Sequence, residues 1–74
     1  MKLKTPLYIR FKILFFLQKG PKPTSELSTK IGCSYEEVKE ELDYLEKLGK
    51  IEKIRSEKFN QDIWIVKEKS YSKT

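Results

Sequence analysis

The strongest constraint in this sequence is that a single residue separates the end of one expected helix from the start of the next. Gly32 is placed to end the first helix, because glycine adopts the left-handed conformation of a helix stop without steric cost. Ser34 begins the second helix, and Ser34 and Glu37 have the spacing of a capping box. Since only Cys33 lies between them, the two helices must meet in a very tight turn. We expect Cys33 to pack inward as a small apolar side chain.

Each of these two helices has an apolar face. The first is short, from about Ser25 to Lys30, with Thr24 as its expected N-cap and with Leu27 and Ile31 directed inward. The second extends to about residue 48. Its apolar stripe has spacings of 4, 3 and 3 and consists of Val38, Leu42, Leu45 and, as a candidate fourth member, Leu48. Both helices are therefore expected to bury one face in a shared core.

Two β-prone runs follow the helices and predict a hairpin. They cover residues 51–55 and 62–66, and the polar residues 56–61 between them form an expected loop of six residues. Trp64, on the returning strand, is expected to be part of the core. Residues 68–74 have no periodicity and are expected to form a loose tail.

Length and composition exclude several classes of protein. The 74 residues suffice for one small domain, with a core over about residues 6–67. The chain has no His and one Cys, so a zinc site of the Cys/His type and an internal disulfide are excluded, and a reducing cytoplasm is indicated. No His base and no glycine-rich phosphate loop are present, so we expect neither an enzyme nor a cofactor. The longest apolar run, residues 13–17, is too short to span a bilayer.

The order of elements is helix, short extended piece, helix, tight turn, helix and hairpin, which is an α+β arrangement. In this order the sequence resembles the winged helix-turn-helix superfamily, especially small prokaryotic transcriptional regulators of the ArsR and MarR kinds. The resemblance covers residues 7–67. The residues that carry it are Ile13, Leu14, Leu17, Thr24, Ser25, Glu26, Leu27, Ile31, Gly32, Cys33, Ser34, Val38, Leu42, Leu45, Glu46, Lys47, Gly49, Ile51 and Glu52.

This resemblance implies a regulator that binds double-stranded DNA. The helix over residues 35–48 would enter the major groove, the preceding helix would approach the backbone, and the hairpin would act as the wing. Thr24 and Ser25, with the backbone N–H groups beside them, would hold a phosphate. The third helix and its cap would contribute Ser34, Tyr35, Lys39 and Tyr44. The wing contacts would be Arg55, Lys58, Asn60 and Gln61.

The distribution of charge departs from that pattern. The chain carries a net charge of +5, which is compatible with a nucleic acid or an acidic protein as partner. Residues 1–33 hold seven basic and one acidic residue, whereas residues 34–49 hold two basic and six acidic residues. The helix expected to meet DNA is thus the most acidic part of the chain. An alternative function follows, in which the acidic face of this helix docks on a basic protein partner.

The N-terminal helix, expected from Pro6 to Lys19, is more apolar than the surface helix of a small domain needs to be. Nine of the eleven residues from 7 to 17 are apolar or aromatic. The core of one chain requires only Ile13, Leu14 and Leu17. We therefore predict a homodimer in which this helix contacts its copy through Tyr8, Phe15 and Phe16. The alternative is that the strands and the tail of the same chain cover these rings.

Overall fold

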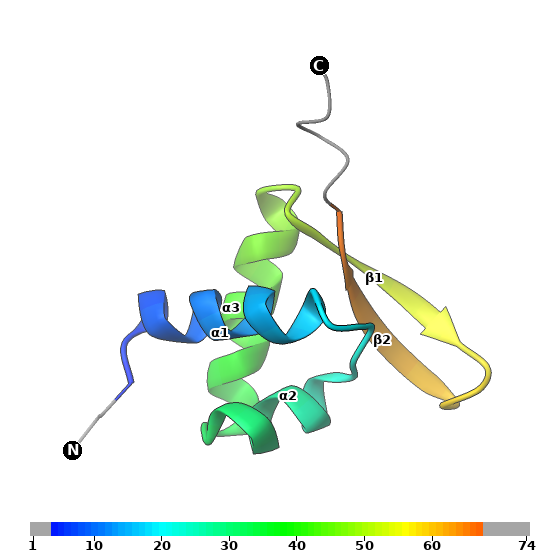
Figure 1. Cartoon of the computed structure of the whole chain (residues 1–74), viewed down its shortest axis with the longest axis horizontal. Coiled ribbons are helices and arrows are strands. Elements are labelled where there is room, and N and C mark those ends of the chain that lie inside the picture. The colour runs from blue at the N-terminus through cyan, green and yellow to red at the C-terminus, as the bar shows by residue number, and fades with distance from the viewer. Residues whose placement is uncertain (1–3, 68–74) are drawn as a thin grey trace.

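Three helices and a hairpin form the fold in the computed structural model, which describes residues 4–67. The elements are α1 (Pro6–Leu17), α2 (Thr24–Ile31), α3 (Tyr35–Lys47), β1 (Ile51–Ser56) and β2 (Gln61–Val66). In Figure 1, α1 crosses α3, α2 lies below both helices, and the two strands project to one side as a wing. The predicted α+β winged-helix fold is confirmed. The tail expected over residues 68–74 lies outside the described residues.

Local signals account for most of the first helix. Thr5 is the N-cap of α1, its side chain accepts a hydrogen bond from the Tyr8 backbone N–H, and Pro6 occupies the first turn. The helix ends at Leu17, two residues before the predicted end at Lys19. The chain continues there as a tighter turn, because the Lys19 N–H donates to the Phe16 carbonyl, three residues back.

The tight turn between α2 and α3 has the predicted conformation. Gly32 is the C-cap of α2 in the left-handed region, with φ of 84°. Ser34 and Glu37 form both halves of the capping box: the Ser34 hydroxyl accepts from the Glu37 N–H, and the Glu37 carboxylate accepts from the Ser34 N–H. Cys33 is half-buried and packs against the core.

The prediction of Thr24 as the N-cap of α2 was wrong. Pro23 is the N-cap, with no side-chain cap, and Thr24 is the first helical residue. The cause is a contact 40 residues away: the Trp64 indole N–H donates to the Thr24 hydroxyl at 2.9 Å. An antiparallel bridge between Lys22 and Trp64 holds β2 beside the start of α2, so the indole reaches this hydroxyl.

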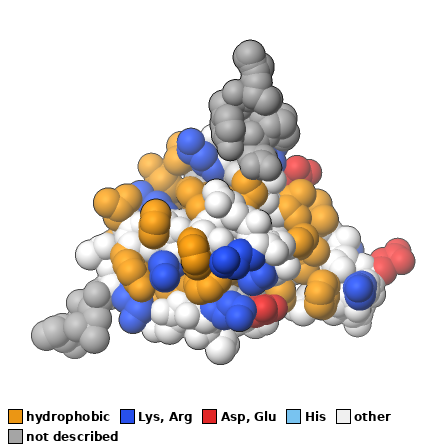
Figure 2. Space-filling view, viewed as in Figure 1, with side chains coloured by type: hydrophobic (Ala, Val, Ile, Leu, Met, Phe, Trp, Pro, Cys, Tyr) orange, Lys and Arg blue, Asp and Glu red, His pale blue; other side chains and the backbone are white. Residues whose placement is uncertain are grey.

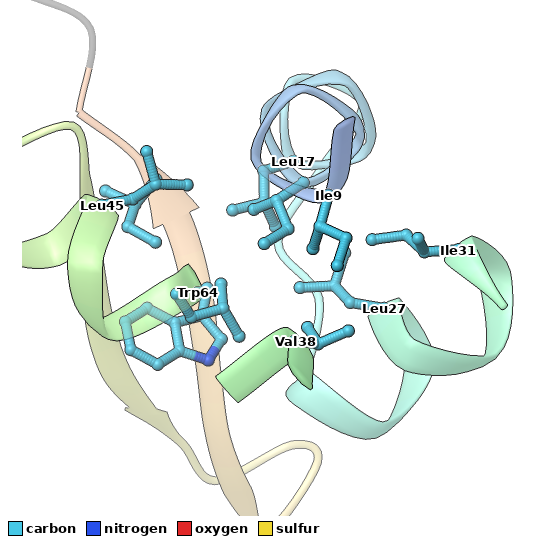
Figure 3. Packing of buried hydrophobic residues seen from close by; sticks show 10 residues of the cluster. Ile9, Leu17, Leu27, Ile31, Val38, Leu45 and Trp64 are labelled. Atoms are coloured by element: carbon cyan, nitrogen blue, oxygen red, sulfur yellow. The ribbon is translucent and has the colours of Figure 1, made fainter. Parts of the chain in front are cut away.

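The core lies where the three helices meet the base of the hairpin. Figure 3 shows side chains from α1, α2 and α3 directed toward one another, with Trp64 beside them on β2. The members are Ile9, Ile13, Leu17, Leu27, Ile31, Val38, Leu42, Leu45, Ile51 and Trp64. Leu48, the candidate fourth member of the α3 stripe, is not part of it and is 52% exposed. The reason is that α3 ends at Lys47 and Leu48 is its C-cap, where the chain turns toward β1.

The wing is longer and its turn shorter than the sequence indicates. Each strand gains one residue, because Ser56 pairs with Gln61, and the loop shrinks from six residues to the four from 57 to 60. The Ser56 hydroxyl accepts from the Phe59 N–H at 3.2 Å, and Asn60 has a positive φ of 57°. Asn tolerates that conformation better than most residues, which permits the tight return.

Candidate nucleic-acid interface

A groove of about 290 Å³ lies between the first turns of α2 and α3 and the wing, and we call it the wing groove. Its lining residues are Thr24, Ser25, Tyr35, Lys39, Lys53, Arg55, Asn60, Gln61, Asp62 and Trp64. Seven of the ten residues predicted to contact DNA are therefore neighbours in space, although they come from three separate segments of the chain. The other three predicted residues, Ser34, Tyr44 and Lys58, do not line the groove.

The base of the wing groove is buried and hydrogen-bonded. Trp64 is 1% exposed and Thr24 is 8% exposed, and their mutual hydrogen bond joins β2 to α2. The Lys53 ammonium lies 5.6 Å from the centre of the Trp64 ring, a cation–π distance. Thr24 thus supports the groove through Trp64, and its hydroxyl is already engaged as an acceptor.

Cationic side chains from two elements line the groove. Lys39 comes from α3, whereas Lys53 and Arg55 come from β1. The Lys39 ammonium is 3.3 Å from the Asp43 carboxylate, one helical turn away. The Arg55 guanidinium lies 3.8 Å from the Asp62 carboxylate on the paired strand. Its other terminal nitrogen donates to the Asn60 side-chain oxygen at 3.4 Å.

The helix starts beside the groove supply backbone donors. Ser25 lies in the first turn of α2 and is exposed, and the first N–H groups of a helix have no partner within the helix. Such donors, together with the positive end of the helix dipole, favour an anion. Ser34 caps α3, and its hydroxyl is engaged with Glu37 in the capping box. Tyr35, the next residue, is 51% exposed and lines the groove.

Tyr44 lies on another side of α3 from the groove. The Arg10 guanidinium of α1 is stacked 4.1 Å from the centre of the Tyr44 ring, and the same guanidinium makes a 2.6 Å ion pair with Glu41. Tyr44 is nine residues from Tyr35, which corresponds to about two and a half helical turns and places the two residues on opposite sides of α3. This spacing was readable from the sequence, whereas the contact with Arg10 was not.

Lys53 and Asp62 are groove residues that the sequence analysis missed. Asp62 directly follows the expected loop and Arg55 directly precedes it, so their pairing across the hairpin could have been read from the predicted strands. Lys53 alternates with Arg55 along β1, and that two-residue period places both on one face of the strand. Lys58 is exposed in the turn of the wing, next to Phe59, which is 48% exposed.

The outward face of α1 carries a strip of exposed apolar side chains. Tyr8 and Phe15, two of the three residues predicted to form a dimer interface, are 42% and 43% exposed. Phe16, the third, is half-buried and packs against the core. The most exposed members, Leu7 and Phe11, at 71% and 67%, were missed, although Leu7, Phe11 and Phe15 follow a four-residue spacing. Figure 2 shows hydrophobic and basic side chains side by side over this region.

The acidic residues of α3 have three different environments. Glu41 is 9% exposed and paired with Arg10, and Glu37 belongs to the capping box. Glu36, Glu40 and Asp43 are exposed. Part of the negative charge of this helix is therefore structural, and the rest is exposed on its surface.

The described part of the chain also bears on metal sites and membrane spans. Between residues 4 and 67, no three His, Cys, Asp or Glu side chains are grouped so that they could hold a metal ion. No helix in that range is long and apolar enough to cross a membrane.

Comparison with known proteins identifies the fold. No protein-family model matches the sequence, and no curated protein matches it. A solved structure of a double-mutant form of ZitR from Lactococcus lactis is similar, with a TM-score of 0.79 and 21% sequence identity. The match covers 95% of this chain and 47% of the ZitR chain, so the chain spans about half the length of that protein. Together with the three helices and the hairpin, this likeness establishes a winged helix.

Proposed function

We propose that this protein is a cytoplasmic transcriptional regulator that binds double-stranded DNA with the wing groove, the start of α3 and the wing. The observation that carries this proposal is the convergence of three cationic side chains, Lys39, Lys53 and Arg55, in a groove with a buried, hydrogen-bonded base. Helix N-termini lie at the same place and add backbone donors. Phosphate oxygens are acceptors that both kinds of group bind.

In this arrangement most of the contacting residues bind the DNA backbone, and few of them contact the bases. Lys39, Lys53 and Arg55 would contact phosphates, and Lys58 at the turn of the wing would contact the backbone farther along. Tyr35, at the start of α3, is exposed and placed to meet a base edge or a sugar. Gln61, at the start of β2, is placed to donate or accept a hydrogen bond from the wing side.

A titration against random-sequence duplex DNA tests this function. If about five phosphates are contacted, the affinity should fall roughly 500-fold between 50 and 200 mM salt, because bound counterions are released from the DNA. The double variant Arg55→Ala and Lys58→Ala should bind about tenfold or more weakly and show a shallower salt dependence. A matched control is Lys47→Ala, since Lys47 lies at the other end of α3.

A protein that is folded and does not bind duplex DNA at 50 mM salt would contradict the proposed function. The exposed acids Glu36 and Glu40 would then be the surface to examine, as a docking site for a basic protein partner. Binding by the wild type that the Arg55 and Lys58 substitutions leave unchanged would place the DNA contact outside the wing.

We further propose that the protein is a homodimer whose contact is the α1 face formed by Leu7, Tyr8, Phe11 and Phe15. This helix is apolar on its core side and on its outer side, which is typical of a helix covered on both sides. A second copy presents the same strip, so two copies can pair about a two-fold axis. Of the predicted contacts, Tyr8 and Phe15 belong to this face, and Phe16 contributes only the part not packed against the core.

Sedimentation velocity over a range of protein concentrations tests the dimer. Phe11→Asp should produce a monomer, whereas Phe59→Asp, which changes an exposed ring on the wing, should not. Because Lys12 and Lys19 of both copies lie beside the contact, added salt should strengthen the association, opposite to its effect on DNA binding. A wild-type protein that sediments as a monomer at micromolar concentration would contradict this proposal.

A further inference from the structure

Two of the cations in the wing groove are each engaged by an acid of the same chain. Lys39 lies 3.3 Å from Asp43, and Arg55 lies 3.8 Å from Asp62. Both pairs are at the surface, with side chains between 41% and 63% exposed. Asp62 itself lines the groove. A phosphate that approaches Lys39 or Arg55 therefore competes with a carboxylate that is already paired with the cation.

We propose that Asp43 and Asp62 are internal competitors of DNA, which occupy Lys39 and Arg55 and lower the affinity of the groove for phosphates. This inference rests on the proposed function, because it concerns how the same groove is regulated. On binding, each cation exchanges one carboxylate for a phosphate oxygen. The two pairs thus set how tightly the protein holds DNA of any sequence, since phosphate contacts supply most non-specific affinity.

The geometry makes this exchange feasible. An exposed ion pair is weak, so displacing one costs at most about fivefold in affinity. Arg55 has a second attachment through Asn60, at 3.4 Å, and a phosphate must rearrange that hydrogen bond as well. A phosphate can accept two parallel hydrogen bonds from a guanidinium. These two bonds replace the contacts of Arg55 with Asp62 and Asn60. Lys39 is held by one carboxylate and exchanges one contact for another.

General repulsion between acids and DNA is a different effect and needs a separate control. Glu40 is exposed on α3, near Asp43, and makes no ion pair within residues 4–67. Glu57, in the turn of the wing, is likewise exposed and makes no ion pair within residues 4–67. Removing either charge should raise affinity only through long-range repulsion. Such an effect does not depend on whether Lys39 or Arg55 is present.

The test is a double-mutant cycle on the full chain, measured by fluorescence anisotropy with a random-sequence duplex at 50 mM salt. Asp43→Asn should tighten binding about two- to fivefold in the wild type, and more than Glu40→Gln does. In a Lys39→Met background, the gain from Asp43→Asn should fall to that of the Glu40→Gln control. Asp62→Asn should behave in the same way with Arg55→Met, with Glu57→Gln as its control.

Each other outcome has a defined meaning. If the gain from Asp43→Asn is the same with and without Lys39, general repulsion explains it and the competition is overturned. If Asp43→Asn or Asp62→Asn weakens binding, the carboxylate positions its cation for DNA, and the proposal is also overturned. If the folded wild type does not bind DNA at 50 mM salt, the proposed function itself fails, and the competition fails with it. All substituted side chains are exposed or half-exposed, and circular dichroism verifies that each variant is folded.

Discussion

The two sides of α3 carry similar residues in opposite situations. On the side that faces α1, Tyr44 and Glu41 are engaged by one guanidinium, that of Arg10. On the side that faces the wing, Tyr35 and Lys39 line an open groove. The two tyrosines differ little in exposure, at 43% and 51%, so exposure does not distinguish them. The neighbouring element does: α1 packs against one side of α3, and the wing leaves a groove on the other.

This comparison separates residues that hold the fold together from residues that are available to a ligand. The ion pair between Arg10 and Glu41 joins α1 to α3, and the two residues are 31 positions apart in the sequence. Because this pair is partly buried, it is expected to contribute to stability. The ion pair between Lys39 and Asp43 lies within one helix at the surface, where solvent screens it. Substitutions on the two sides should therefore affect different measurements.

The largest expected effect is on the α1 side. Arg10→Met removes the cation from Glu41, whose side chain is only 12% exposed, and leaves a poorly solvated carboxylate without its partner. The free energy of unfolding should fall by about 1–3 kcal/mol, measured by urea denaturation. Lys12→Met, on the outer face of the same helix, should change it by less than about 0.5 kcal/mol. Equal effects of the two substitutions would remove the basis for treating the α1 side as structural.

The next effect concerns the base of the wing groove. Thr24→Val retains the shape of the side chain but leaves the buried Trp64 indole N–H without its acceptor. The expected loss is about 1–2 kcal/mol in the same urea experiment, and Thr24→Ser should recover most of it. A Thr24→Val variant as stable as the wild type would mean that the backbone bridge between Lys22 and Trp64, together with packing, holds the wing to α2 without this hydrogen bond.

The two tyrosines provide the most direct comparison. Tyr35→Ala should weaken binding to duplex DNA about fivefold, equivalent to roughly 1 kcal/mol, with little change in stability. Tyr44→Ala should leave DNA binding unchanged and lower stability by about 0.5–1 kcal/mol through the lost stacking with Arg10. Anisotropy titrations and urea denaturation on both variants check this. The reverse pattern would show that the α1 side of α3 is the DNA-binding side.

The smallest effect on the stability of the protein is expected for the exposed ion pair between Lys39 and Asp43. Lys39→Met should change the free energy of unfolding by less than about 0.5 kcal/mol, because both side chains of its ion pair are exposed. Its effect on DNA affinity should be larger than its effect on stability. A loss of more than about 1 kcal/mol would indicate that the pair supports α3 and is not available for exchange with a phosphate.

Much of the groove was predictable because helix starts and hairpins place residues in known directions. Tyr35 follows a recognisable N-cap, and Arg55 and Gln61 flank a recognisable turn. Tyr44 was carried over from the resemblance as a further contact of α3, and about two and a half helical turns separate it from Tyr35. On α1 the apolar excess was evident, but which of its side chains are exposed depends on which face packs against the core, and the sequence analysis did not use the four-residue spacing of Leu7, Phe11 and Phe15.

The sequence by itself determined the features whose partners lie within a few residues. The capping box of Ser34 and Glu37 and the helix stop at Gly32 depend only on neighbouring backbone, so local chemistry specifies them. Tertiary structure decided the roles of Thr24 and Arg10, whose partners lie 40 and 31 residues away. A hydroxyl or a guanidinium can cap a helix, bind a ligand or satisfy a buried group. Which of these it does depends on the polar group that folding brings within hydrogen-bond distance, because a buried donor or charge without a partner is costly.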